Sequence, residues 1–309
     1  EGIRYFDISA DGSKLVFEKG ISLYLQEEGN DAPQKLTMRL SRDYRHTPVQ
    51  HKTFSKEISE YSISPNGKYT AFVVRGEIFL INNEKDKSRT VRLSDHAYRD
   101  FDVDWVNDST LIFVSDRTGQ RELYLLRSAD PQNTSMYESL RHQAQQITTT
   151  EAPEGDPVVA PNGKQIAFLR GNGTFIVADI DTENAKLNNE KVLREGWAAP
   201  SGIAWSPDSK WLAYSMQDLY FNAEIFIHPA DNHRKPVNVS MHPKGDYSPF
   251  WSADGTKLGF ISERNNGDRD LWFAWLKKED WQKTQEDWEQ SGDKENKKDK
   301  DEKEKQQDL

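Results

Sequence analysis

Short apolar runs alternate along this chain with polar turn phrases, and one such phrase recurs from end to end. In the stretch GIAWSPDSKWLAYS, residues 202–215, two runs flank the turn Ser206-Pro207-Asp208-Ser209. Pro presets φ for the first central position of a type I turn, and Asp suits the second. The flanking residues are aromatic or branched, as strands prefer. The phrase therefore predicts a β-hairpin, and variants of it lie at residues 6–17, 61–72, 103–113, 158–168, 203–214 and 249–260.

Each hairpin is followed by further strand-like runs. Third runs lie at 21–25, 77–81, 122–126, 174–178, 224–228 and 270–274, and shorter fourth runs lie at 34–37, 91–94, 146–148, 191–193 and 236–240. Four short strands per repeat are typical of β-propeller blades. A β-sandwich is the alternative, but the regular recurrence of a whole four-strand phrase argues against it. We predict an all-β propeller over residues 1–276 with six recognisable four-stranded blades, six or seven in the intact ring, and an incomplete last blade.

The composition excludes several classes of protein. The formal net charge is −10, which argues against a nucleic-acid partner, and no apolar run approaches the length of a membrane span. Without cysteine the chain has no disulfide, thiol nucleophile or cysteine-based zinc site. The sequence begins with Glu1 rather than Met and ends inside an incomplete blade, so we expect processing upstream and further blades or domains beyond both ends.

Residues 277–309 differ from the repeats, because nearly every residue from Asp293 to Lys305 is charged. This composition predicts a charged linker with a flexible tail. The alternative is a short helix over Lys278–Glu289, which would place Trp281 and Trp288 on one face for docking.

The search for catalytic motifs is mostly negative. The chain lacks a Gly-x-Ser-x-Gly elbow, a phosphate loop and close metal-ligand spacing among its seven histidines, so we predict no catalytic residue, metal site or cofactor. The loops at about 38–60 and 127–157 are longer than hairpins require, which suggests lids or binding loops. In the loops that join second and third strands, such as 116–122, Asp and Arg are expected to pair locally. The first long loop carries a basic cluster, either ordinary surface charge or a contact for an anion or a peptide C-terminus: Arg39, Arg42, Arg45 and His46.

Three phrases carry a family resemblance: SPNGKYTAFVVRGEIFLI, DRTGQRELYLL and AWSPDSKWLAYS. They resemble the TolB-type propeller repeats of tricorn-like serine peptidases of the S41 class, over about residues 1–275. The resemblance implies a non-catalytic module that guides or filters peptides or unfolded polypeptides toward downstream PDZ-like and peptidase domains. Nothing in the chain matches the surroundings of the family's catalytic Ser and His. The resemblance also implies a periplasmic or otherwise exported bacterial protein, with a cytoplasmic location left open.

Three other functions stay open. The chain could be a TolB-like periplasmic propeller that binds a protein partner, or the propeller of a prolyl-oligopeptidase-type enzyme. It could also be a self-contained propeller enzyme, whose carboxylates would converge on the axis from Asp7, Asp102, Asp104 and Asp156. A homo-oligomer is likewise open as a partner.

Overall fold

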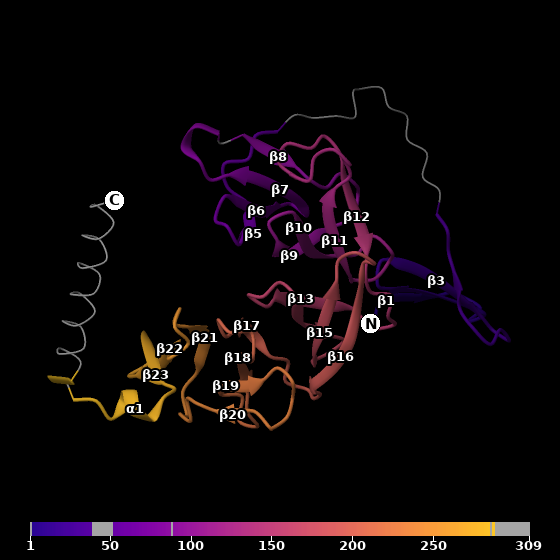
Figure 1. Cartoon of the computed structure of the whole chain (residues 1–309). Coiled ribbons are helices and arrows are strands. Elements are labelled where there is room, and N and C mark those ends of the chain that lie inside the picture. The colour runs from indigo at the N-terminus through magenta and orange to yellow at the C-terminus, as the bar shows by residue number, and fades with distance from the viewer. Residues whose placement is uncertain (1, 39–51, 88, 285, 288–309) are drawn as a thin grey trace. The chain divides into compact units, whose positions relative to one another are not determined.

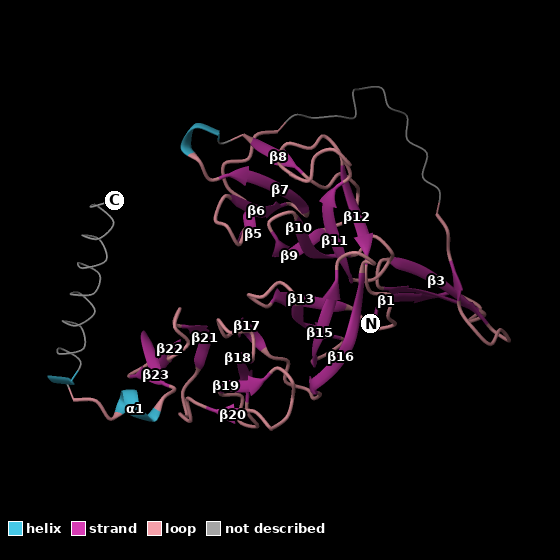
Figure 2. Ribbon diagram, in the orientation of Figure 1, coloured by secondary structure: helices cyan, strands magenta, loops and turns pink. Residues whose placement is uncertain are grey.

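Nearly every regular element of the chain is a β-strand (Figure 2). The computed structural model describes residues 2–38, 52–87, 89–284 and 286–287. The chain forms two compact units, Glu1–Ala199 and Pro200–Leu309. Each unit is a series of antiparallel sheets in which strands that follow one another in sequence also pair with one another.

The first unit contains four sheets of four strands each (Figure 1). They are blade 1 with β1 (Ile3–Ile8), β2 (Lys14–Lys19), β3 (Ser22–Glu27) and β4 (Gln34–Lys35); blade 2 with β5 (Ile58–Ile63), β6 (Tyr69–Val74), β7 (Glu77–Asn82) and β8 (Thr90–Arg92); blade 3 with β9 (Asp100–Asn107), β10 (Thr110–Ser115), β11 (Glu122–Ser128) and β12 (His142–Gln146); and blade 4 with β13 (Glu154–Val159), β14 (Gln165–Arg170), β15 (Thr174–Asp181) and β16 (Lys186–Arg194). A short 3-10 helix, η1 (Lys85–Lys87), precedes β8.

The second unit contains one four-stranded and one three-stranded sheet. They are blade 5 with β17 (Ser201–Trp205), β18 (Trp211–Gln217), β19 (Ala223–Pro229) and β20 (Val237–Asn238), and blade 6 with β21 (Asp246–Trp251), β22 (Lys257–Asn265) and β23 (Asp268–Trp275), followed by the helix α1 (Lys278–Trp281). The prediction of six propeller blades with an incomplete last one is confirmed, because blade 6 lacks a fourth strand among the described residues.

The hairpin turns form as their sequences predict. In the turn between β17 and β18, the N–H of Ser209 donates to the carbonyl of Ser206 at 2.9 Å. The closing residue adopts a left-handed conformation, with φ of 59° at Ser209 and 67° at Gly163 in the equivalent turn of blade 4. This conformation explains why Gly closes four of the six turns.

Apolar packing between neighbouring sheets holds each unit together. Every residue of β10 is buried, because blade 3 is covered on one face by blade 2 and on the other by blade 4. Leu111 and Phe113 pack toward blade 2, while Ile112 and Val114 pack toward blade 4. In the second unit, Ala213 and Ile225 of blade 5 form a core with Leu258 and Phe260 of blade 6.

Some predicted strand positions need correction. The fourth strand of blade 3 lies at His142–Gln146 rather than at residues 146–148. The apolar side chain of Ile147 suggested a strand there, but this residue follows the strand and packs into the core between blades 3 and 4. The long loop at 127–157 therefore contains a strand of its own.

The segment after blade 6 begins with a helix at Lys278, as the docking alternative predicted, but this helix ends at Trp281. Trp281 is 60% exposed, so its indole does not dock. Trp288 lies outside the described residues. Among the residues that the structure describes, no helix is long and apolar enough to cross a membrane.

Candidate functional site on the innermost strands

The first strands of blades 2, 3 and 4 carry a row of carboxylates. Each acid stands three residues before an equivalent residue that pairs across the hairpin: Glu60 before Ile63 on β5, Asp102 before Trp105 on β9 and Asp156 before Val159 on β13. The same position holds Tyr5 in blade 1, Gly202 in blade 5 and Ser248 in blade 6, so the acids belong to three consecutive blades only. We call Glu60, Asp102 and Asp156 the acidic row.

A bulge presents the acidic row at the strand edge. Asp102 and Asp156 have φ of 51° and 50°, and strand pairing shifts at both positions. A left-handed conformation in a non-glycine residue costs free energy, so the surrounding contacts must hold it. One such contact is the N–H of Asp156, which donates to Oδ2 of Asp102 at 3.2 Å. Consecutive members of the row are thereby linked between blades 3 and 4.

Asp104 ties the three innermost strands together. Its Oδ1 accepts the hydroxyl of Ser62 on β5 at 2.9 Å, and its Oδ2 accepts the N–H of Val159 on β13 at 2.8 Å. The indole N–H of Trp105 adds a hydrogen bond to the carbonyl of Ser62 at 3.0 Å. Asp104 is thus a structural carboxylate whose oxygens are both engaged.

Burial and mutual repulsion raise the pKa values of this region. Desolvation raises the pKa of Glu60 most, and the carboxylate of Asp102 raises it further. For Asp102, desolvation is again the main cause, opposed by the hydrogen bond from the Asp156 N–H and reinforced by the Asp156 carboxylate. Burial also raises the pKa of Asp104. An incoming cation or N–H donor would lower these pKa values again, because it stabilises the ionised carboxylates.

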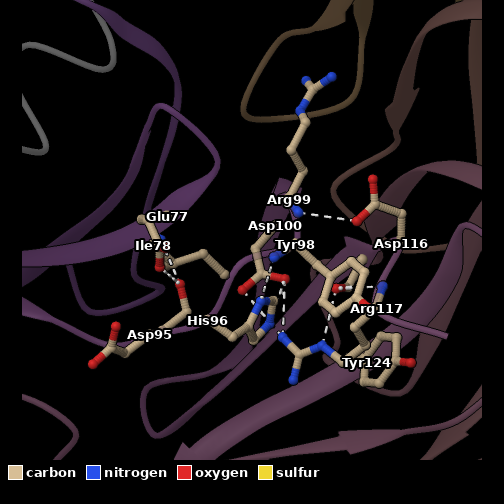
Figure 3. A network of polar contacts seen from close by, with 12 residues as sticks. Glu77, Ile78, Asp95, His96, Tyr98, Arg99, Asp100, Asp116, Arg117 and Tyr124 are labelled. Carbon is tan, nitrogen blue, oxygen red and sulfur yellow. Dashed lines mark hydrogen bonds and ion pairs between the residues drawn. The ribbon is translucent and has the colours of Figure 1, made fainter. Parts of the chain in front are cut away.

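A second polar network lies where blade 3 meets blade 2 (Figure 3). The side chain of Asp100 is 0% exposed, and Nη2 of Arg117 donates to its two oxygens at 2.9 and 3.1 Å. Nε of Arg117 donates to the hydroxyl of Ser115 at 2.9 Å. The guanidinium also lies over the rings of Phe113 and Tyr124.

Blade 6 repeats this arrangement. Nη2 of Arg264 donates to both oxygens of Asp246, and its Nε donates to Ser262. The expectation of local pairing by the Asp and Arg residues of these loops is wrong for the loop at 116–122. Oδ1 of Asp116 accepts the N–H of Arg99, and Arg117 pairs with Asp100, each 17 residues earlier in the chain. The repetition in two blades indicates a structural clamp rather than a catalytic group.

His96 and Asp100 are close together in Figure 3, and Ser94 stands two residues before His96, but these three residues are not arranged as a catalytic triad. The hydroxyl of Ser94 donates to Oε2 of Glu77 at 2.8 Å and accepts the N–H of Ile78 at 2.9 Å. Nδ1 of His96 accepts the N–H of Tyr98 at 3.0 Å, and its Nε2 lies 3.5 Å from Oδ1 of Asp100. The imidazole therefore has no nitrogen placed to take a proton from the serine.

The structure places the predicted site residues as follows. The basic cluster of Arg39, Arg42, Arg45 and His46 lies outside the described residues, so its role stays a prediction. Asp102, Asp104 and Asp156 come together, whereas Asp7 lies on β1 and accepts the N–H of Ile8 within its own strand. Within the described ranges, no three His, Asp or Glu side chains are grouped to hold a metal ion.

Glu60 and Ser62 belong to no recognisable sequence motif, because their partners lie about one blade away in sequence. An alignment of the six hairpins on their turns would have found Glu60, since it places this residue in register with Asp102 and Asp156. Repeats are compared most usefully position by position, and the acidic row is visible only in that comparison.

Comparison with known proteins points to one class of peptidase, although no protein-family model matches the chain. The chain is similar to the tricorn protease homolog of Saccharolobus solfataricus, with 23% identity over 83% of this chain and 22% of that protein. It is similar to a putative tricorn-like protease C-terminal subunit of Sulfurisphaera tokodaii, with 23% identity over 83% of this chain and 27% of that protein. It is also similar to tricorn protease homolog 1 of Streptomyces coelicolor, with 24% identity over 83% of this chain and 23% of that protein.

The chain thus spans about a quarter of the length of these relatives. Among solved structures, putative TolB from Agrobacterium tumefaciens aligns with a TM-score of 0.49 and 16% identity, over 70% of this chain and 76% of that one. TolB from Acinetobacter baumannii aligns with a TM-score of 0.46 and 18% identity, over 81% of this chain and 57% of that one. The resemblance to tricorn-like proteases that the repeat phrases predicted is confirmed.

Proposed function

We propose that this chain is a non-catalytic propeller module of a tricorn-like serine peptidase, which guides or filters peptides toward a peptidase core outside this chain. The observation that carries the proposal is the acidic row on three adjacent innermost strands. The similarity to tricorn protease homologues supports the class of the parent protein. In line with a non-catalytic module, Ser94, His96 and Asp100 are engaged in structural contacts.

The strand order explains why an extended peptide is a suitable ligand. β5, β9 and β13 are each at the edge of their sheet, so one side of each strand has no neighbouring strand within that sheet. Edge strands present backbone groups that can pair with an extended chain, whereas a folded protein has its own backbone already paired. The acidic row adds acceptors for N–H groups, lysine side chains or a peptide N-terminus.

Peptide binding to the full chain tests the proposal. A short fluorescein-labelled peptide of Gly, Ser and Lys should bind, and binding should weaken with added salt because its charges are screened. Glu60→Gln and Asp156→Asn should each weaken binding by about tenfold, the loss expected for a hydrogen bond to a charged group. Asp7→Asn is the matched control and should leave binding unchanged, since Asp7 bonds within its own strand.

Three results would contradict the proposal. The peptide could fail to bind, or the row variants could bind it as tightly as the control does. Hydrolysis of peptides by this chain, absent from a mock purification of cells without the chain, would contradict the non-catalytic role. A folded cationic protein that binds better than the peptide would favour a TolB-like interaction propeller.

The remaining partners follow from the same resemblance. We propose that PDZ-like and peptidase domains accompany this module in the parent protein and that the protein is exported, as the tricorn-like and TolB-like resemblances imply. Two experiments test these statements separately. The first asks whether this chain co-purifies with the downstream region of its gene product when the two are expressed as separate chains. The second locates the protein by fractionation of the source cells.

A further inference from the structure

Three tryptophans line a cavity in the second unit. They are Trp211 at the start of β18, Trp251 at the end of β21 and Trp275 at the end of β23, and the cavity measures about 640 Å³. Ile227 and Val239 contribute aliphatic wall from blade 5. This volume and this apolar lining are in the range of pockets that bind small ligands or peptide side chains.

Two cations are stacked on the indoles of this cavity. The guanidinium of Arg234 lies 4.6 Å from the ring centroid of Trp211, and Nζ of Lys257 lies 4.5 Å from that of Trp275. Neither side chain forms an ion pair with any residue of the described part of the chain. Stacking holds both cations in place while their remaining N–H donors stay available to a ligand.

The carboxylates at the same rim are already engaged. Oδ1 of Asp208 accepts the hydroxyl of Ser206 at 2.6 Å, and Oδ1 of Asp254 accepts the N–H of Thr256 at 3.0 Å. Serine hydroxyls are the main cause of the lowered pKa of both groups, and the charge of Lys257 contributes least for Asp254. These acids are therefore bound within their own turns. Lys257 does not line the cavity, and its charge acts on Asp254, so Arg234 is the stacked cation that a ligand can pair with.

We infer that this cavity is a docking site for a linear peptide segment in which an acidic residue stands next to a large apolar residue. The apolar side chain enters between the indoles, and the neighbouring carboxylate pairs with Arg234. The cavity is built from hairpin turns, from β19 and β20 of blade 5 and from the ends of β21 and β23, and it contains no residue of the acidic row. The inference therefore goes beyond peptide guidance by the acidic row and does not depend on it.

Charge complementarity selects this ligand over other apolar peptides. The chain has a net charge of −10, so an acidic segment is repelled by most of its surface and favoured only where cations are unpaired. Arg is a preferred residue for such contacts, because its planar guanidinium binds a carboxylate while one face stays stacked on an aromatic ring. A purely apolar peptide would leave the Arg234 guanidinium without a carboxylate partner.

Titration of the full chain with labelled peptides tests the inference. The probe is a Gly-Ser peptide with a central Asp-Phe pair and blocked ends, and its controls replace Asp by Asn or Phe by Ala. We expect the probe to bind and each replacement to weaken binding about tenfold or more. Arg234→Gln should weaken binding of the probe to a similar degree. The variant protein should bind the Asp and Asn peptides equally.

Arg269→Gln is the matched control variant. Arg269 also lies over an aromatic ring, that of Tyr247, but it pairs with Glu263 and does not line the cavity. Both arginines are exposed, so neither substitution should prevent folding. The inference would be overturned if the wild type bound the Asp and Asn peptides equally. It would also be overturned if Arg234→Gln and Arg269→Gln lost the same amount of affinity for the probe.

Two further outcomes separate alternative ligands. If a peptide that ends in Phe with a free carboxylate binds and the blocked Asp-Phe probe does not, the site reads a peptide terminus and the proposed motif is wrong. If the Lys-containing peptide binds the acidic row and no acidic-apolar peptide binds at all, the docking site fails while peptide guidance stands.

Discussion

Replacing Arg117 by Met should destabilise the first unit strongly, because the buried carboxylate of Asp100 would lose its cation. The side chain of Asp100 is 0% exposed and that of Arg117 is 20% exposed, and their closest contact is 2.9 Å. Nε2 of His96 lies 3.5 Å from Oδ1 of Asp100 but forms no hydrogen bond with any residue that the structure describes. Water is therefore largely excluded from both partners, and the charge of Asp100 cannot be solvated in place of the lost pair.

Removal of one partner of a buried ion pair costs about 3–5 kcal/mol. For a unit of this size, a loss of that magnitude corresponds to a fall in melting temperature of about 6–20 °C. Met keeps part of the apolar contact that the Arg117 stem makes with Phe113 and Tyr124, so lost packing contributes less than the lost charge. The expected loss of unfolding free energy is thus mostly electrostatic.

The assay is urea denaturation followed by far-ultraviolet circular dichroism, with Arg269→Met as the control. Arg269 is 72% exposed in its pair with Glu263, so its loss should cost less than about 1 kcal/mol. The double variant Asp100→Asn with Arg117→Met removes the charge and its partner together and should recover most of the stability. The reasoning is refuted if Arg117→Met costs no more than the control, or if the double variant is no more stable than Arg117→Met.

Two further predictions follow from the inner strands and the turns. Glu60→Gln should stabilise the protein near pH 7: burial and Asp102 raise the folded-state pKa of Glu60, so stability falls as pH rises above its ordinary value of 4.5. The gain over the wild type should disappear below that pH in denaturation curves, and a gain that persists at low pH would contradict this cause. Gly163→Ala should cost more than Gly12→Ala, because both positions have positive φ but only at Gly163 would the new Cβ lie 2.6 Å from the carbonyl oxygen of Val106. Equal melting temperatures of the two variants would contradict the close approach.

The hairpins could be predicted from sequence because their determinants are local. Pro207 and Gly163 set the turn geometry within four residues, and the flanking apolar residues require burial whatever covers them. The fourth strand of blade 3 was misplaced because the strand at His142–Gln146 is polar and carries no hydrophobic alternation. Its position is fixed by pairing with β11, which is a tertiary contact.

The polar sites could be predicted only in part, because their members come from different blades. The pairing of Arg117 was expected to be local, but its main partner Asp100 stands 17 residues earlier in the chain. Ser62 and Asp104 meet across 42 residues. Residue types alone do not indicate such pairs, whereas the repeat does once each blade is aligned on its turn.

The same alignment separates structure from function. A feature that recurs, such as the Asp, Arg and Ser clamp of blades 3 and 6, has a structural role in the blades that carry it. Features that differ at equivalent positions are free of that role. The acidic row stops after blade 4, where Gly202 and Ser248 replace the acids, and the cation-stacked tryptophans occur between blades 5 and 6. The two proposed sites therefore differ in charge, with carboxylates in the acidic row and Arg234 at the tryptophan cavity, and a segment that binds one site should bind the other weakly.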